Sequence, residues 1–173
     1  MEMTYKVLLH EADYRAIYEN MRQDGTLWSA WPDIDPDEWT PEIVVRLMSR
    51  PDVLVLGGAI DGVPAGFMTL HPVTQRTLTA EIGVAAFRPF FSQAAALCRG
   101  ALLWACENLE LASFMGKVAA PNRHVLAMLG QVGFRELGRV PGLFWYTRKQ
   151  RFVDGVLVMA TPESIRKISA EEA

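Results

Sequence analysis

A chain of 173 residues, half of them hydrophobic, is long enough for one domain with its own core. Its formal net charge is -3 and its sequence pI is about 5.6, which argues against the basic surface typical of nucleic-acid-binding modules. The glycines and prolines are scattered, so no collagen-like or low-complexity segment is predicted. We expect a single domain over residues 1–173 that binds no nucleic acid.

The sequence also bears on membranes and on redox state. Its first residues show no basic segment ahead of an apolar run, and no apolar run reaches the roughly 18–20 residues that cross a bilayer. Cys98 and Cys106 lie eight positions apart in one apolar stretch. In a helix they would be about 12 Å apart, beyond the roughly 7 Å that a disulfide allows. We expect reduced thiols, a cytoplasmic location and no membrane contact.

The N-terminal part of the chain is expected to form a strand and two helices. A strand over Tyr5–His10 leads into a helix over Glu11–Arg22, whose apolar residues recur on one helical face. These residues are Tyr14, Ile17, Tyr18 and Met21. A loop rich in tryptophans and acids follows. The second helix is predicted over Pro41–Met48, because Thr40 suits the N-cap and proline suits the first turn.

Three strands are predicted next. Val53–Ile60 and Val63–Leu70 are rich in apolar residues, and Asp61-Gly62 separates them. An Asp-Gly pair between two such runs indicates a two-residue hairpin, since both turn positions need a positive φ. A third strand over Thr77–Phe87 carries apolar residues in alternation. The three strands should pair antiparallel.

The rest of the chain alternates helices and strands. Residues 92–110 are apolar almost all round, which is typical of a helix buried on most sides. The tail over residues 162–173 is polar and expected to be loose. The resulting order is β-α-α-β-β-β-α-β-α-β-β, an α/β fold. Its last elements are a strand over Ser113–Ala120, a helix over Asn122–Val132 ended by Gly133, a strand from Phe134, the aromatic run Leu143–Thr147, and a strand over Phe152–Ala160.

This order, together with residues 77–160, resembles the Gcn5-related N-acetyltransferase (GNAT) family. The match is closest in NRHVLAMLGQVGF, residues 122–134, where an Asn opens a short helix that ends in a Gly-Phe pair. The spacing from WACENLELA to this segment, and the final FVDGVLVMA, resemble the branch that acetylates protein N-termini and amino metabolites. The resemblance implies a mixed, largely antiparallel central sheet flanked by helices. It also implies transfer of an acetyl group from acetyl-CoA to a primary amine of a small molecule or peptide.

In that family a Gln/Arg-x-x-Gly-x-Gly/Ala turn before the long helix binds the pyrophosphate of coenzyme A. Backbone N–H groups and the positive end of a helix suit this anion. Here the aligned segment is RPFFSQAAAL, with Ser92 and Ala94 in place of the glycines. The alternative is a plain strand-to-helix turn with Ser92 as N-cap, and Asn122 could likewise be only an N-cap. The resemblance implies cofactor contacts from Val84, Ala86, Arg88, Phe91, Ser92, Gln93, Ala94, Ala95 and Asn122.

Catalysis needs a base for the amine and an acid for the leaving thiolate. Glu81, in the middle of the third strand, resembles a family base, although it could simply point to solvent on the outer face. The family's usual acid is a Tyr shortly before the Gly-Phe pair, and it falls near Leu129, which cannot donate a proton. Either Tyr146 or water takes this part, or the protein binds CoA without efficient transfer.

The acceptor site is expected in the loop between the two N-terminal helices. Its aromatic and acidic side chains could hold a cationic amine by cation–π and ionic contacts: Trp28, Trp31, Trp39, Asp33, Asp35 and Asp37. The alternative is that the tryptophans, including Trp39, fill the edge of the core while the acids are solvated.

The expected partners are acetyl-CoA and an amine acceptor, with a homodimer as an option for the assembly. His10, His71 and His124 lack metal-ligand spacing, so no metal site is predicted. The rival hypothesis is a CoA-binding or assembly module that keeps the fold without catalysis.

Overall fold

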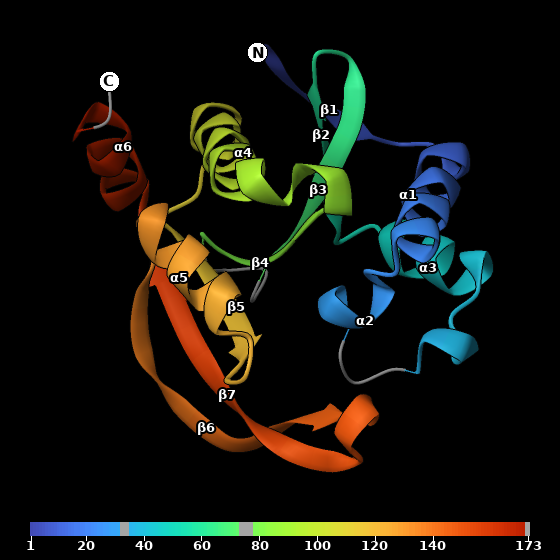
Figure 1. Cartoon of the computed structure of the whole chain (residues 1–173). Helices are drawn as coiled ribbons and strands as arrows, with labels where there is room; N and C mark the ends of the chain where they lie inside the picture. Colours follow the sequence, from blue (N-terminus) through green and yellow to red (C-terminus); the bar gives the residue numbers. More distant parts are fainter. Residues whose placement is uncertain (32–34, 73–77, 172–173) are drawn as a thin grey trace.

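The computed structural model describes residues 1–31, 35–72 and 78–171 (Figure 1). The first half of the chain contains β1 (Met3–Leu8), α1 (Glu11–Asp24), α2 (Leu27–Ala30), η1 (Pro36–Glu38), α3 (Pro41–Met48), β2 (Leu54–Ile60), β3 (Val63–Pro72) and β4 (Thr79–Ala86). The second half contains η2 (Arg88–Gln93), α4 (Ala94–Asn108), β5 (Ser113–Ala119), α5 (Arg123–Gln131), β6 (Arg135–Tyr146), η3 (Thr147–Lys149), β7 (Arg151–Ala160) and α6 (Pro162–Glu171). Here η denotes a 3₁₀ helix.

Within the described residues, seven strands form one sheet in the order β1-β2-β3-β4-β5-β7-β6. Neighbouring strands are antiparallel except β4 and β5, which are parallel. The predicted fold class, a mixed and largely antiparallel sheet with flanking helices, is confirmed. The hairpin between β2 and β3 turns at Asp61 and Gly62, whose φ angles are 48° and 80°. These positive values confirm the predicted two-residue turn.

Helices cover both faces of the sheet. Adjacent residues of a strand point to opposite faces, and Val55 and Leu56 accordingly belong to different clusters of buried side chains. Helices α1 and α3 pack on the face of Val55, and α4, α5 and α6 on the face of Leu56. Figure 1 shows α1–α3 on the right of the view and α4–α6 toward the left. We call these the α1 face and the α4 face. The apolar residues predicted to share one face of the first helix are all buried: Tyr14, Ile17, Tyr18 and Met21.

Two predictions about irregular segments were wrong. The loop predicted between the first two long helices contains the short helix α2 and the turn η1. The tail predicted to be loose forms α6, and Ile165 is fully buried among the α4 face side chains. The helix start is fixed by Thr161 and Ser164, each of which donates its backbone N–H to the other's hydroxyl, at 3.0 and 3.2 Å. This reciprocal cap and the burial of one side chain hold the segment in place.

Candidate active site

Strands β4 and β5 diverge at the centre of the sheet. They pair only from Thr79–Ser113 to Glu81–Met115. Beyond this point β4 stays paired with β3, and β5 stays paired with β7. In the described part of the chain, the edge of β4 over residues 82–86 therefore has no strand partner on the β5 side. Its outward backbone groups can hydrogen-bond a bound molecule.

A cavity of about 630 Å³ lies at this divergence. Helices α4 and α5 contribute residues to it, and so do η2, β3, β4 and Ala30 of α2. Val84 and Ala86 line it from the α4 face, whereas Ala85 and Phe67 belong to the α1 face. The cavity is thus reached by side chains from both faces of β4. A chamber with this position could bring two molecules together from opposite sides.

Six of the nine predicted cofactor-binding residues line this cavity: Val84, Ala86, Phe91, Ser92, Ala94 and Ala95. The lining does not include the other three predicted residues. The backbone N–H of Arg88 donates to Asp24 Oδ2 at 2.7 Å, and Gln93 Oε1 accepts from the Ser92 hydroxyl at 2.9 Å. Asn122 is buried at the N-cap of α5, but its side chain makes no capping hydrogen bond. Gln93, not Ser92, is the N-cap of α4, so the predicted capping alternative for Ser92 is wrong.

The start of α4 is suited to an anion. Neither η2 nor the first turn of α4 contains an acidic residue. The small side chains of Ser92, Ala94 and Ala95 would let a bound molecule approach the backbone. Peptide dipoles give this end of the helix a partial positive charge.

Glu81 lies on the α1 face of β4, while its neighbour Ile82 is buried on the α4 face. Its side chain is 32% exposed, and Oε1 lies 3.0 Å from Lys117 Nζ on β5. His71 of β3 is the direct cross-strand partner of Glu81. Burial lowers the pKa of His71 from its ordinary value, and the charge of Glu81 opposes this shift. The sequence alone did not point to His71 or Lys117 as neighbours of Glu81, because strand alternation gives the face of each residue but not the register between strands.

Neither Tyr146 nor Leu129 lines the cavity, where an acid would have to protonate the leaving thiolate. Tyr146 ends β6, is 7% exposed, and packs in a cluster with Ala119 and Val153. It is absent from the described cavity lining. Leu129 is buried in the core of the α4 face. An acid role for Tyr146 stays a prediction that the geometry does not favour.

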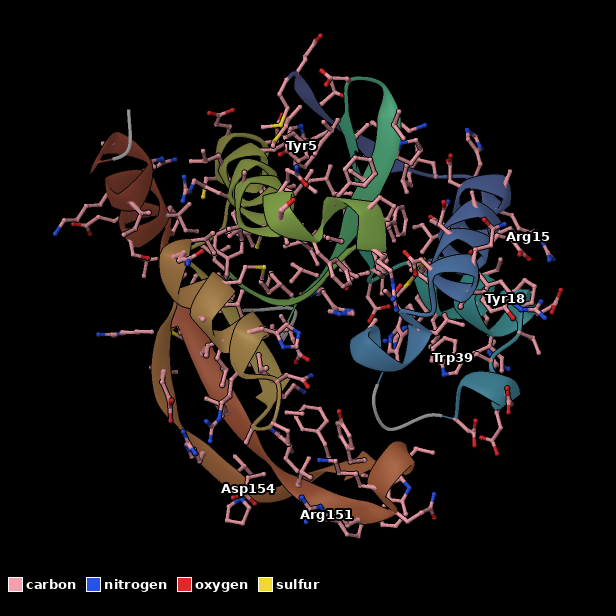
Figure 2. The ribbon with its side chains drawn as sticks, viewed as in Figure 1. Tyr5, Arg15, Tyr18, Trp39, Arg151 and Asp154 are labelled. Carbon is pink, nitrogen blue, oxygen red and sulfur yellow. The ribbon has the colours of Figure 1, made fainter. Side chains whose placement is uncertain are left out.

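Aromatic side chains connect the loop before α3 to the cavity. Trp31 stacks on Trp39 with ring centroids 4.4 Å apart, and on Phe67 at 6.2 Å. Phe67 in turn lines the cavity. Trp39 is 3% exposed and lies beside Tyr18, whose hydroxyl donates to the Trp39 carbonyl at 3.0 Å (Figure 2). Trp39 therefore fills the core, whereas Trp31 packs behind Phe67, which lines the cavity.

The structure describes the predicted acceptor residues Trp28 and Asp33 only in part or not at all. Trp28 belongs to α2, but its side chain is outside the described part of the structure. Asp33 lies outside the described residues. Among the residues that are described, no group of three or more His, Cys, Asp or Glu side chains could hold a metal ion. No helix in the described ranges is long and apolar enough to cross a membrane.

No protein-family model matches this sequence, and no curated protein matches it. Solved structures do. A chimera of the Vibrio cholerae spermidine N-acetyltransferase SpeG and hSSAT superposes with a TM-score of 0.79 at 16% identity, over 95% of this chain and 98% of that one. RimJ of Mycobacterium smegmatis, solved with CoA-disulfide, gives 0.78 at 20% identity, over 98% and 89%. The V. cholerae spermidine N-acetyltransferase in complex with CoA and spermine gives 0.75 at 17% identity, over 94% and 97%. At these identities the likeness establishes a shared fold.

Proposed function

We propose that this chain, which has the fold of the Gcn5-related N-acetyltransferases, transfers an acetyl group from acetyl-CoA to a primary amine. The observation that carries the proposal is the cavity at the divergence of β4 and β5, which residues from both faces of the sheet line. An acyl donor can enter beside α4, and an amine can approach from the α1 face. Direct transfer between two substrates needs such a meeting point.

The residues around the cavity fit coenzyme A. Its phosphates would meet the start of α4, where acids are absent from the first turn and side chains are small. Its pantetheine amides would find hydrogen-bonding groups on the edge of β4 over residues 82–86, which lacks a strand partner on one side among the described residues. When bound, acetyl-CoA supplies a thioester that an amine can attack.

Glu81 is the residue proposed to remove the proton from the acceptor amine. An ammonium group cannot attack a thioester until it loses a proton, so a positioned base accelerates the reaction. Glu81 offers a partly exposed carboxylate on the α1 face, and Lys117 holds one of its oxygens. Glu81 lies four residues along β4 from Ala85 in the cavity wall, about 13 Å at the rise of a strand. Bridging water must carry the proton over part of this path.

The acceptor is proposed to be a cationic amine of a small molecule or peptide. Trp31 and Phe67 present stacked aromatic rings beside the cavity, and aromatic faces attract cations. Two of the three similar structures described above carry the name spermidine N-acetyltransferase, and one was solved with spermine. This supports the choice of polyamines as the first acceptors to assay.

The test combines binding and turnover. At about 100 times Kd, acetyl-CoA should raise the free energy of unfolding by roughly 2.7 kcal/mol. Acetylated product should then be detected by mass spectrometry with at least one amine from a panel of polyamines, amino metabolites and peptide N-termini. No stabilisation at millimolar acetyl-CoA would overturn the proposal.

A second candidate is a CoA-binding protein without efficient transfer. The placement of Leu129 in the core, where the family's acid would fall, favours it. Stabilisation by acetyl-CoA with no acetylated product across the panel would select this candidate.

A further inference from the structure

Three cross-strand pairs of β3 and β4 lie in a row on the α1 face: Phe67 with Ala85, Thr69 with Gly83, and His71 with Glu81. They share a face because residues two apart on a strand point the same way. The first pair lines the cavity. The middle pair has no side chain at Gly83, and a Cβ there would lie 2.7 Å from Thr69 Oγ1. A row of small and polar groups therefore leads from the cavity to His71 and Glu81.

His71 and Glu81 lie directly opposite each other on neighbouring strands, so a proton can pass between their side chains through water. Residues directly opposite on antiparallel strands have Cβ atoms about 4.5–5.5 Å apart. Lys117 donates to Glu81 Oε1 at 3.0 Å. A carboxylate has a second oxygen, so this ion pair leaves Glu81 able to accept another proton donor.

Burial lowers the pKa of His71, which favours its neutral imidazole, and four nearby charges modify this shift. Burial is the largest influence and lowers its pKa, and Arg50 and Lys117 lower it further. Glu81 and Asp52 raise it. The net shift is downward from the ordinary value. A neutral imidazole keeps one nitrogen that can accept a proton.

We propose that His71 receives, through Glu81, the proton that the acceptor amine loses. The N–H bond of the ammonium group breaks and its proton passes to Glu81, whose O–H proton then moves to the imidazole. The freed nitrogen attacks the thioester carbon, the C–N bond forms and the C–S bond breaks. The nitrogen then passes its second proton through water to the leaving sulfur, and the imidazolium of His71 releases the first proton to solvent. His71 acts through Glu81, so it is a positioning residue, and its role rests on the acetyltransferase function proposed above.

NMR titration of the histidine ring protons tests the coupling without any need for turnover. Glu81→Gln should lower the pKa of His71 further, because it removes a charge that raises this pKa. Lys117→Gln should raise it, because the lysine charge lowers it. A His71 pKa that neither substitution moves would overturn the inference.

The pH dependence of kcat/KM tests the role itself. In the wild-type protein, kcat/KM should fall as the pH drops through the pKa of His71, because a protonated imidazole cannot take up the proton. His71→Gln should remove this acid limb and lower kcat/KM at pH 7 about 10-fold, less than the roughly 10²–10⁴-fold of a direct general base, because His71 acts through Glu81. His10→Gln is the matched control and should keep the wild-type profile. Turnover by the wild type with an unchanged profile in His71→Gln would overturn this inference alone, whereas no wild-type turnover would overturn the proposed function on which it rests.

Discussion

Replacing Gly100 by alanine is expected to destabilise the protein, although alanine is the better helix former. Gly100 lies within α4, and a Cβ on it would overlap the Tyr5 hydroxyl and lie 2.5 Å from Tyr5 Cζ. Tyr5 lies beside α4 (Figure 2), where its hydroxyl donates to the Leu97 carbonyl at 3.3 Å. The ring belongs to β1, which is paired with β2. It can therefore make room only by leaving its place or by pushing α4 outward.

Gly130 in α5 supplies the matched control, because a Cβ there meets nothing within 4 Å. A helical glycine-to-alanine change gains about 0.5–1 kcal/mol, and this gain is common to both variants. Overpacking a tight site costs about 1–3 kcal/mol. The free energies of unfolding of Gly100→Ala and Gly130→Ala should therefore differ by about 1–3 kcal/mol, with Gly130→Ala the more stable.

Urea unfolding followed by tryptophan fluorescence measures this difference. In a chain of 150–250 residues, 1 kcal/mol corresponds to about 2–4 °C in Tm, so thermal melts give an independent value. Tyr5→Leu in the Gly100→Ala background should recover part of the loss, with a coupling energy above about 0.5 kcal/mol in the double-mutant cycle. If Gly100→Ala proves at least as stable as Gly130→Ala, the Tyr5 hydroxyl does not occupy the space beside Gly100.

Four further outcomes are expected. Ala94→Asp should abolish the stabilisation by acetyl-CoA, because its carboxylate would face the phosphates at the start of α4, whereas Ala94→Ser should keep it. Glu81→Gln should retain acetyl-CoA binding in thermal melts and lower turnover about 10²–10⁴-fold at neutral pH, with part of the loss recovered at high pH; unchanged turnover would exclude Glu81 as the base. Trp31→Ala should raise the acceptor's KM, and this change expressed as a free energy should exceed the loss in the free energy of unfolding. Trp39→Ala should instead lower the free energy of unfolding by about 3–5 kcal/mol in urea unfolding. Burial raises the pKa of the Cys98 thiol to about 12, so iodoacetamide at pH 8 should label Cys98 only after unfolding; rapid labelling of Cys98 in the native protein, located by peptide mass spectrometry to separate it from half-buried Cys106, would contradict this.

Local chemistry determined much of the fold, and the sequence was sufficient to predict those parts. The buried face of α1 follows from apolar residues at helical spacing, which depends only on the chain's own geometry. The turn at Asp61-Gly62 follows from the backbone angles that these two residues tolerate. Six of the predicted cofactor residues gather at the cavity because they lie near one strand-to-helix junction, where chain order keeps them together.

Tertiary structure decided the features that join distant segments. Strands β4 and β5 are separated in sequence by η2 and α4, and no residue pattern in either strand marks where their pairing stops. The pair of His71 with Glu81, and the reach of Lys117 to the same carboxylate, depend on register across three strands. Tyr146 is near Gly133 in sequence, yet β6 carries it into a cluster outside the cavity lining. A one-residue shift in register moves every side chain to the other face, so such contacts are fixed only when the whole core packs.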